Sequence, residues 1–303
     1  MTYNPNDPHA AMLKGYICEM PPLEDIFSVK GKTALVTGGT SGLGFNIAVR
    51  LLQGGANVIV ASNSDQQADN AMYLFAECGY GTERVQFCNT DVTQEQEIIE
   101  LVKFTDKAFG SLDILVTSAA IWNYAHIYDM PAEEFEKVVA TNLTGTFKTV
   151  KHVSRYMIDH SIEGKMVLIS SNSAWLPYPV FGGYGHYAAS KGGVNALAIE
   201  AAKELKRFGI RVNAVAPGGM ATPGAMNNMA LDCLSEEAQD ALYDEISTPQ
   251  LDEIKTVDGV ARVAYAMCTD FTDCLTGECI VPDNGMTHNI LTYQPEISQY
   301  PED

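Results

Sequence analysis

The sequence predicts a doubly wound α/β fold, in which about seven parallel strands form one sheet with helices on both faces. Three observations predict it. From Gly31 onward, short β-branched runs alternate with longer segments of helical periodicity, which is the pattern of βαβ units. The short runs are almost continuously apolar, as expected of parallel strands buried on both faces. The first run leads directly into a glycine-rich turn that opens a helix.

The predicted elements follow in order along one domain, residues 29–290. Each strand is predicted at a short apolar run: Ala34–Thr37, Val58–Ala61, Val85–Cys88, Ile114–Thr117, Met166–Ser170, Val212–Ala216 and Cys279–Pro282. Each helix is predicted at a periodic segment between runs: Gly42–Gln53, Asp65–Glu77, Glu95–Ala108, Pro131–Tyr156, Tyr187–Phe208 and Val257–Cys268.

Three segments do not follow this alternation. Residues 1–28 are rich in Pro, Asn and Asp, and we expect an arm that packs on the domain through Ile26 and Phe27. Residues 220–255 form an insertion after a late strand, at the carboxyl edge where ligands of such sheets bind, so they are a candidate substrate lid. Residues 291–303 are expected to be a solvated acidic tail.

The charge balance disfavours several classes of partner. The 303 residues include 19 Lys and Arg against 38 Asp and Glu, a formal net charge of −19. Nucleic acid and anionic membrane surfaces need a basic footprint, so neither is expected as a main partner. No apolar run approaches the roughly 20 residues that span a bilayer. No basic patch precedes an apolar core at the N-terminus, so we expect no secretory signal.

The cysteines predict neither a metal site nor a disulfide framework. There are seven, scattered along the chain and without a CxxC pair. We therefore expect free thiols, Cys274 and Cys279 included, no bound metal, and a soluble protein in the reducing cytoplasm.

A glycine-rich turn, residues 37–44 (the glycine loop), joins the first strand to the first helix. Glycine lets the backbone turn tightly and approach a pyrophosphate, whose charge then lies at the helix N-terminus. The spacing is GxxxGxG, and not the GxGxxG of the general dinucleotide fingerprint. A plain strand-to-helix turn also favours glycine, but this setting favours a nucleotide. The candidate cofactor-binding residues here are Gly38, Thr40, Ser41, Gly42, Leu43 and Gly44.

Tyr187 and Lys191 are one helical turn apart, so a helix places them on one face. A phenol ionises at about pH 10, too high for acid–base work at neutral pH. A nearby ammonium favours the phenolate, so we expect Lys191 to lower the pKa of Tyr187 and make it a proton donor and acceptor. An isolated pair at this spacing is usually just a surface Tyr and Lys.

Together, in this order and on this fold pattern, the two motifs resemble the classical short-chain dehydrogenase/reductase family, over about residues 29–287. The resemblance implies a single Rossmann-like domain and an NAD(P)-dependent oxidoreductase acting on a carbonyl or secondary alcohol. It implies that Tyr187 exchanges a proton with the substrate oxygen, which Ser171 hydrogen-bonds, and that Lys191 binds the nicotinamide ribose. Asn142 matches a helix asparagine that holds a water between that lysine and solvent.

The resemblance also implies further cofactor contacts. Asp91 resembles the aspartate that contacts the adenine ring, and the stretch from Pro217 to Thr222 resembles the one that closes over the nicotinamide. The implied residues outside the glycine loop are Ser62, Asn63, Asp91, Val92, Ser118, Ala119, Tyr187, Lys191, Pro217, Gly218, Met220 and Thr222.

Three positions depart from the family pattern. Residues 117–120 read TSAA where the family has NNAG, which affects the geometry under the adenosine and not the fold. Ser171 lies unusually far before Tyr187, so the catalytic serine is either Ser171, at the strand end, or the closer Ser173. Residues 283–285 read DNG where DGG is common, a change we expect to be harmless.

Charge after the second strand favours NAD(H) over NADP(H). A clear NAD preference would come from Asp in place of Ser62, and a clear NADP preference from Arg in place of Asn63. Neither is present. However, residues 51–83 contain no Lys or Arg, whereas Asp65 and Asp69 are close, so a 2′-phosphate would meet carboxylates without a cation.

Aromatic and methionine side chains favour a bulky apolar substrate, such as a hydroxysteroid-like ketone, over a small polyol. They lie in segments 121–126, 174–186 and 220–255, but such clusters also fill cores and subunit contacts about equally often. The candidate substrate-binding residues are Ser173, Trp122, Trp175 and Tyr184, with Tyr178, Phe181, Met220, Met226 and Met229 in the same segments.

Two histidines are weaker candidates. His186 is adjacent to Tyr187, and adjacent helical positions point to different faces, so a packed or subunit-contact histidine is expected. His126 is either a substrate contact or a solvated loop residue.

The same motifs are compatible with other functions. One is a reductase of sugars, polyols or small ketones, and another is an epimerase or dehydratase that uses the cofactor transiently. A third is a non-catalytic NAD(P)-binding redox sensor, although a sensor needs the glycines and not the proton relay. The family resemblance also implies a homo-oligomer, a dimer or tetramer, joined through the helices 131–156 and 187–208.

Overall fold

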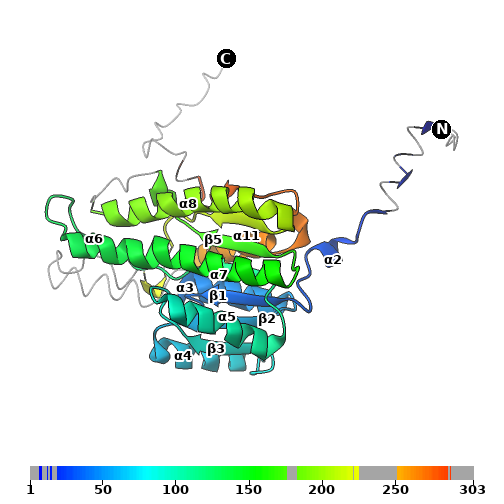
Figure 1. Ribbon diagram of the computed structural model, residues 1–303, viewed down its shortest axis with the longest axis horizontal. Helices are drawn as coiled ribbons and strands as arrows, with labels where there is room; N and C mark the ends of the chain where they lie inside the picture. Colours follow the sequence, from blue (N-terminus) through cyan, green and yellow to red (C-terminus); the bar gives the residue numbers. More distant parts are fainter. Residues whose placement is uncertain are drawn as a thin grey trace, which may run out of the picture.

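In the described residues, seven parallel strands form one sheet in the order β3-β2-β1-β4-β5-β6-β7 (Figure 1). The computed structural model describes residues 7, 8, 12, 14, 15, 19–175, 183–220, 222–224, 251–285 and 287. The strands are β1 Thr33–Thr37, β2 Asn57–Ser62, β3 Val85–Asn89, β4 Ile114–Thr117, β5 Lys165–Ile169, β6 Arg211–Val215 and β7 Cys279–Ile280. The strand order reverses between β1 and β4, and such a switch point opens a ligand crevice at the carboxyl ends of the strands.

Helices cover both faces of the sheet (Figure 1). One face carries α3, α4 and α11, and the other carries α5, α7 and α8. The helices are α2 Leu23–Ile26, α3 Gly42–Gln53, α4 Asp65–Glu77, α5 Glu95–Phe109, α6 Ala132–Val139, α7 Thr146–Asp159, α8 Gly185–Leu205 and α11 Leu251–Met267. The π-helix is η1 Ala140–Gly145, and the 3₁₀ turns are η2 Asn172–Ala174, η3 Lys206–Phe208 and η5 Asp270–Thr272.

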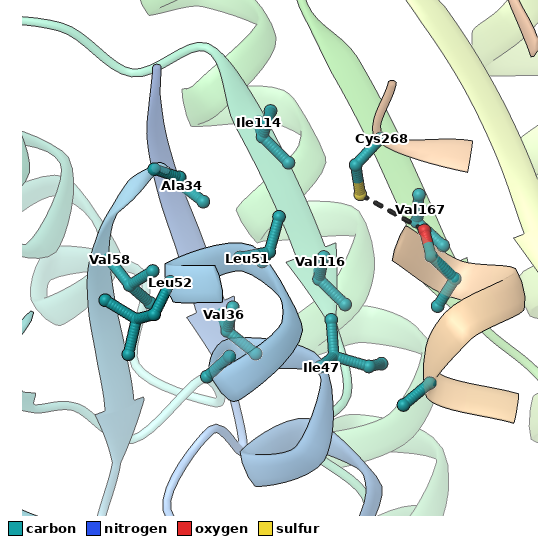
Figure 2. Packing of buried hydrophobic residues seen from close by; sticks show 14 of the residues in the cluster. Ala34, Val36, Ile47, Leu51, Leu52, Val58, Ile114, Val116, Val167 and Cys268 are labelled. Carbon is teal, nitrogen blue, oxygen red and sulfur yellow. Dashed lines mark hydrogen bonds between the residues drawn. The ribbon is translucent and has the colours of Figure 1, made fainter. Parts of the chain in front are cut away.

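Alternate residues along the strands contribute to two cores, one on each face of the sheet. Ala34 and Val36 of β1 pack in the cluster with α3, whereas Leu35 packs in the cluster with α5, α7 and α8. Every residue of β1 is buried, which explains why the run is continuously apolar. Figure 2 shows Ile47 and Leu51 of α3 lying over Val36 and the neighbouring β4.

Most predicted elements are present at or near their predicted bounds. The seven strands are all there, and α3 and α4 have the predicted ends. The last long helix begins at Leu251 and not at Val257, so the end of the predicted lid is helical. Likewise, α8 begins at Gly185, just before its predicted start.

The single helix predicted over Pro131–Tyr156 is wrong. The structure has α6, then the π-helical segment η1, then α7. A π-helix is wider than an α-helix, and side-chain periodicity does not detect this local change of backbone. Gly145, which ends η1, packs closely on Val92, because a Cβ there would lie 2.8 Å from the Val92 Cγ2.

The end of the N-terminal arm packs on the domain through Phe27, as predicted. Its ring stacks on Phe271 with centroids 4.3 Å apart, and its carbonyl accepts a hydrogen bond from the Tyr265 hydroxyl. Residues 225–250 of the predicted lid and the predicted tail, 291–303, lie outside the described residues. Among the described helices, none has the length and apolar character needed to cross a membrane.

Candidate functional site

The glycine loop lies against the loop that follows β4, at the switch point of the sheet. A Cβ on Gly38, whose φ is +66°, would lie 2.7 Å from the backbone nitrogen of Ala119. A Cβ on Gly44 would lie 2.2 Å from the Gly38 carbonyl oxygen. The Ser118 amide donates to the last β1 carbonyl at 3.0 Å, so the altered residues after β4 keep the ladder. Only glycine fits at these two positions.

The first turn of α3 fits the pyrophosphate of a dinucleotide. Ser41 is its N-cap residue and makes no side-chain capping bond. Beside it, the buried Thr40 Oγ1 has no hydrogen-bond partner in the described part of the chain. The free amides and the dipole of a helix N-terminus favour an anion. Gly42 opens this turn, and the side chain of Leu43 is buried in the core.

The residues predicted to contact the adenosine lie at the carboxyl ends of β2, β3 and β4. The Ser62 hydroxyl accepts a hydrogen bond from the amide two residues on, at 3.2 Å, and Asn63 is exposed. Asp91 accepts from the amide two residues on at 2.9 Å, which closes the turn after β3. Val92 is buried against η1. The structure therefore gathers the predicted residues along one edge of the sheet.

Ser171 and Tyr187 are brought together by the end of β5 and the start of α8. The Ser171 hydroxyl lies near the Tyr187 phenol and acts to lower its pKa, against the larger effect of desolvation. Ser171 also caps the 3₁₀ turn after β5, where its Oγ accepts from the Ser173 amide at 3.1 Å. Of the two serines that the sequence left open, Ser171 is thus the one whose hydroxyl acts on Tyr187, and Ser173 contributes its backbone amide to that arrangement.

Lys191 lies beside Tyr187 but does not lower its pKa in this structure. Its Nζ is 5.6 Å from the Tyr187 ring centroid and donates to the Ile169 carbonyl at 2.8 Å. Desolvation raises the pKa of Tyr187 to about 12, and the Ser171 hydroxyl only partly offsets this. Desolvation also lowers the pKa of Lys191 to about 8. The expected lowering of the Tyr187 pKa is therefore wrong here, because removal of the phenol from water raises this pKa more than the Ser171 hydroxyl lowers it.

Asn142 connects the loop after β4 to α8. It lies in η1 and is fully buried. Its Oδ1 accepts from the Ile121 amide at 2.8 Å, and its Nδ2 donates to the Ile121 carbonyl at 2.9 Å and to the Ser190 Oγ at 3.1 Å. The Ser190 hydroxyl in turn donates to the Tyr187 carbonyl at 2.7 Å. The carboxamide thus helps to hold the tyrosine in place.

The segment predicted to close over the nicotinamide follows β6. The Pro217 carbonyl accepts from the Asn172 amide at 2.9 Å. Gly218 packs on Asp283, because a Cβ there would lie 2.8 Å from the Asp283 Cβ. Met220 packs against the core, and Thr222 lies against the glycine loop, 3.4 Å from a Cβ built on Gly42.

The sequence did not single out Asn172 or the anchoring role of Asp283. Asp283 is buried, and its carboxylate accepts from the Gly285 amide at 3.0 Å and the Thr287 amide at 2.6 Å. It therefore holds the turn after β7 against the segment after β6. The position of Asn172 could have indicated its role, because it lies between the two candidate serines, Ser171 and Ser173.

Two aromatic side chains of the predicted substrate wall lie next to Tyr187. The ring centroids of Trp122 and Tyr184 are 5.5 and 6.1 Å from that of Tyr187. The Trp122 ring also faces Gly224, where a Cβ would lie 3.3 Å away. Trp175 is 50% exposed. The other predicted wall residues, Tyr178, Phe181, Met226 and Met229, lie outside the described residues.

The two candidate histidines, His186 and His126, differ in burial. His186 is fully buried, which confirms the expected packed histidine, and its Nε2 lies 2.7 Å from the Asn123 Oδ1. His126 is exposed and stacks on Tyr128 with ring centroids 5.3 Å apart. Only His186 is therefore part of the arrangement around Tyr187.

A family model described as short chain dehydrogenase matches residues 32–231. The chain belongs to the short-chain dehydrogenase family. This short-chain dehydrogenase is thus an oxidoreductase that acts on alcohol or carbonyl groups of small molecules and binds an NAD(P) nucleotide. The fold class and the family indicated by the motifs are both confirmed.

Relatives of this short-chain dehydrogenase match over nearly their whole length. It is 30% identical over 271 residues to short-chain dehydrogenase reductase 3c of Arabidopsis thaliana, covering 86% of this chain and 95% of the relative. Levodione reductase is 26% identical with a TM-score of 0.74, covering 86% and 98% of the two chains. A putative gluconate dehydrogenase from Agrobacterium tumefaciens is 27% identical with a TM-score of 0.72, covering the same shares.

Proposed function

We propose that this short-chain dehydrogenase transfers hydride between NAD(H) and a ketone or secondary alcohol, with Tyr187 as its acid–base residue. The observation that carries the proposal is the placement of the Tyr187 phenol, with the Ser171 hydroxyl near it and the Lys191 ammonium beside its ring. The bound nicotinamide supplies or accepts the hydride. A phenol whose pKa is about 12 stays protonated at neutral pH, so Tyr187 starts as a proton donor to a carbonyl oxygen.

The neighbouring residues have supporting roles in this proposal. Ser171 hydrogen-bonds the substrate oxygen and stabilises the charge that develops on it. Lys191, whose pKa of about 8 leaves it mostly protonated at neutral pH, binds the nicotinamide ribose. Asn142 positions Tyr187 through Ser190 and anchors the loop after β4.

The cofactor preference is proposed to be NAD(H), because of an exposed carboxylate at the start of α4. The Asp65 Oδ1 accepts from Asn89 Nδ2 at 2.6 Å, which holds the carboxylate between the ends of β2 and β3. A 2′-phosphate placed there would be repelled by it at short range.

We expect kcat/KM for NADH to exceed that for NADPH. Asp65→Asn should raise kcat/KM for NADPH about 3- to 10-fold and leave that for NADH nearly unchanged, since one repulsive charge is removed. Glu77→Gln is the matched control, because it removes the same charge from the far end of α4. Steady-state rates with both cofactors measure this, and equal or better use of NADPH by the wild type would contradict the preference.

The substrate is proposed to be bulky and apolar, for example a hydroxysteroid-like ketone. Trp122 and Tyr184 beside Tyr187 support this, and so does the structural likeness to a reductase named for levodione. A sugar, polyol or small-ketone substrate is the second candidate, favoured by the likeness to a putative gluconate dehydrogenase.

We expect hydrophobic cyclic ketones to turn over with NADH at least about 10-fold faster, by kcat/KM, than sugars and small polyols, because apolar walls bind apolar surface. NADH oxidation measured against one panel, from sugars to steroids, tests this. A higher kcat/KM for sugars than for hydrophobic ketones would contradict the proposal of an apolar substrate. NADH binding with no turnover across the panel would favour the redox-sensor alternative, and turnover without net NADH consumption would favour an epimerase or dehydratase.

We further propose a homo-oligomeric protein, a dimer or tetramer, in the reducing cytoplasm. Phe147 on α7 and Ile199 on α8 are half exposed, which suits helices that meet a second subunit. All five described cysteines, Cys274 and Cys279 among them, are free thiols, and free thiols are compatible with a reducing compartment. The lid role of residues 220–255 and the division into arm, domain and tail are part of the same proposal.

A further inference from the structure

The loop after β4 is held by hydrogen bonds on both sides of Trp122, to η1 on one side and to the start of α8 on the other. On one side, the carboxamide of Asn142 binds both the amide and the carbonyl of Ile121, at 2.8 and 2.9 Å. On the other side, the Asn123 Oδ1 lies 2.7 Å from the Nε2 of His186. The ring of Trp122 is therefore held next to that of Tyr187.

The backbone amide of Tyr187 has no carbonyl acceptor within its own helix. Because α8 begins at Gly185, this amide belongs to the first turn, whose donors lack helical partners. The carbonyl four residues back, that of Gly183, accepts from the Ala125 amide at 3.1 Å. The Tyr187 amide donates instead to the Nδ1 of His186, at 2.9 Å.

These contacts assign one protonation state to the imidazole. Since Nδ1 accepts from the Tyr187 amide, the proton of the neutral ring is on Nε2, which donates to the Asn123 Oδ1. We propose that neutral His186 is a positioning residue, which connects Asn123 to the backbone of Tyr187 and makes the placement of the acid–base residue sensitive to acid. This inference rests on the proposed role of Tyr187.

Protonation of His186 would break this connection, because a second N–H would then face the Tyr187 amide. Desolvation and two neighbouring groups act on the pKa of the ring. Desolvation is the largest influence and lowers the pKa below 6.5, while the Tyr184 backbone and Glu134 of α6 favour the protonated form. The Tyr184 backbone would hydrogen-bond the protonated ring in place of the Tyr187 amide. We therefore expect kcat to fall as the pH falls through a value below 6.5.

The free energy of unfolding should also decrease as the pH falls. The unfolded chain takes up a proton on His186 at about pH 6.5, before the folded chain does. The contribution of the neutral ring to folding is thus present above that pH. It is lost as the pH falls toward the lower folded pKa.

Two variants distinguish the hydrogen bond at His186 Nδ1 from the one at Nε2. His186→Asn keeps an acceptor for the Tyr187 amide but cannot reach Asn123, and its side chain does not titrate. It should lower kcat at pH 7.5 about 5-fold, the effect of one lost hydrogen bond, and abolish the acidic limb of the kcat profile. His186→Phe loses both bonds and should lower kcat about 100-fold, while the KM for NADH stays within about twofold of wild type.

A second measurement does not depend on turnover. Nitrogen-15 NMR of the ligand-free protein should show the Nε2–H tautomer for one of the six histidines, identified by its loss in His186→Asn. The titration of this histidine should have a midpoint below pH 6.5. The chemical shift of the Tyr187 amide should change with the same midpoint.

An Nδ1–H tautomer, an unchanged acidic limb in His186→Asn, or wild-type kcat in His186→Phe would each overturn the inference. If the NMR titration is found as expected but the wild type turns over no substrate, the connection stands and the proposed function fails.

Discussion

Tyr187→Phe is expected to lower turnover about 10³-fold and to leave NADH affinity within about twofold of wild type. The substitution removes only the hydroxyl that lies near Ser171. The ring, with its neighbours Trp122 and Tyr184, is kept, so the wall of the site should persist. Single-turnover rates with a ketone, together with titration of NADH followed by fluorescence, measure the two quantities.

Tyr156→Phe is the matched control. It also removes a phenol hydroxyl, but that hydroxyl donates to Asp106 between α7 and α5, at 2.6 Å, away from the site. We expect this control to lose stability and not turnover. Loss of NADH binding in Tyr187→Phe would make Tyr187 structural, and retained turnover would assign the acid–base role to another residue.

Gly44→Ala is expected to weaken NADH binding at least about 10-fold and to destabilise the fold by about 1–3 kcal/mol, the usual effect of overpacking. The added Cβ would lie 2.2 Å from the Gly38 carbonyl oxygen, and the backbone cannot relieve that contact without moving. The movement would displace the first turn of α3, where the pyrophosphate fits. NADH titration and thermal unfolding followed by circular dichroism measure both effects.

Gly259→Ala is the control for a glycine within a helix. A Cβ there has only the Arg262 Nη2 near it, at 3.8 Å, so a methyl group fits. We expect a gain of about 0.5–1 kcal/mol in stability, because alanine favours the helix, with NADH affinity unchanged. Wild-type NADH affinity in Gly44→Ala would show that the close contact in the glycine loop is unimportant for the cofactor.

The central strands could be predicted because they are buried on both faces of the sheet. In β1, Ala34 and Val36 enter one core and Leu35 the other, so these successive positions are all apolar and the run can be recognised in the sequence. The glycine loop could be predicted for a similar reason, since the contacts at Gly38 and Gly44 leave no room for a side chain.

The π-helical segment could not be predicted in this way. Side-chain periodicity continues through Ala140–Gly145 with little change, while the backbone bonds do not. The contacts of this segment with the rest of the protein, Gly145 against Val92 and the hydrogen bonds of Asn142 to Ile121, join segments distant in sequence.

The sequence by itself determined the doubly wound sheet, the glycine loop and the pairing of Tyr187 with Lys191, because each depends on residues adjacent in the chain or one helical turn apart. Only the tertiary structure decided that Ser171 and not Ser173 has its hydroxyl near the Tyr187 phenol, and that His186 joins the Tyr187 amide to Asn123. It also reversed the expected shift in the tyrosine pKa. Hydrogen bonds between distant segments, and the loss of water around a group, arise only when the chain has folded, so local spacing does not encode them.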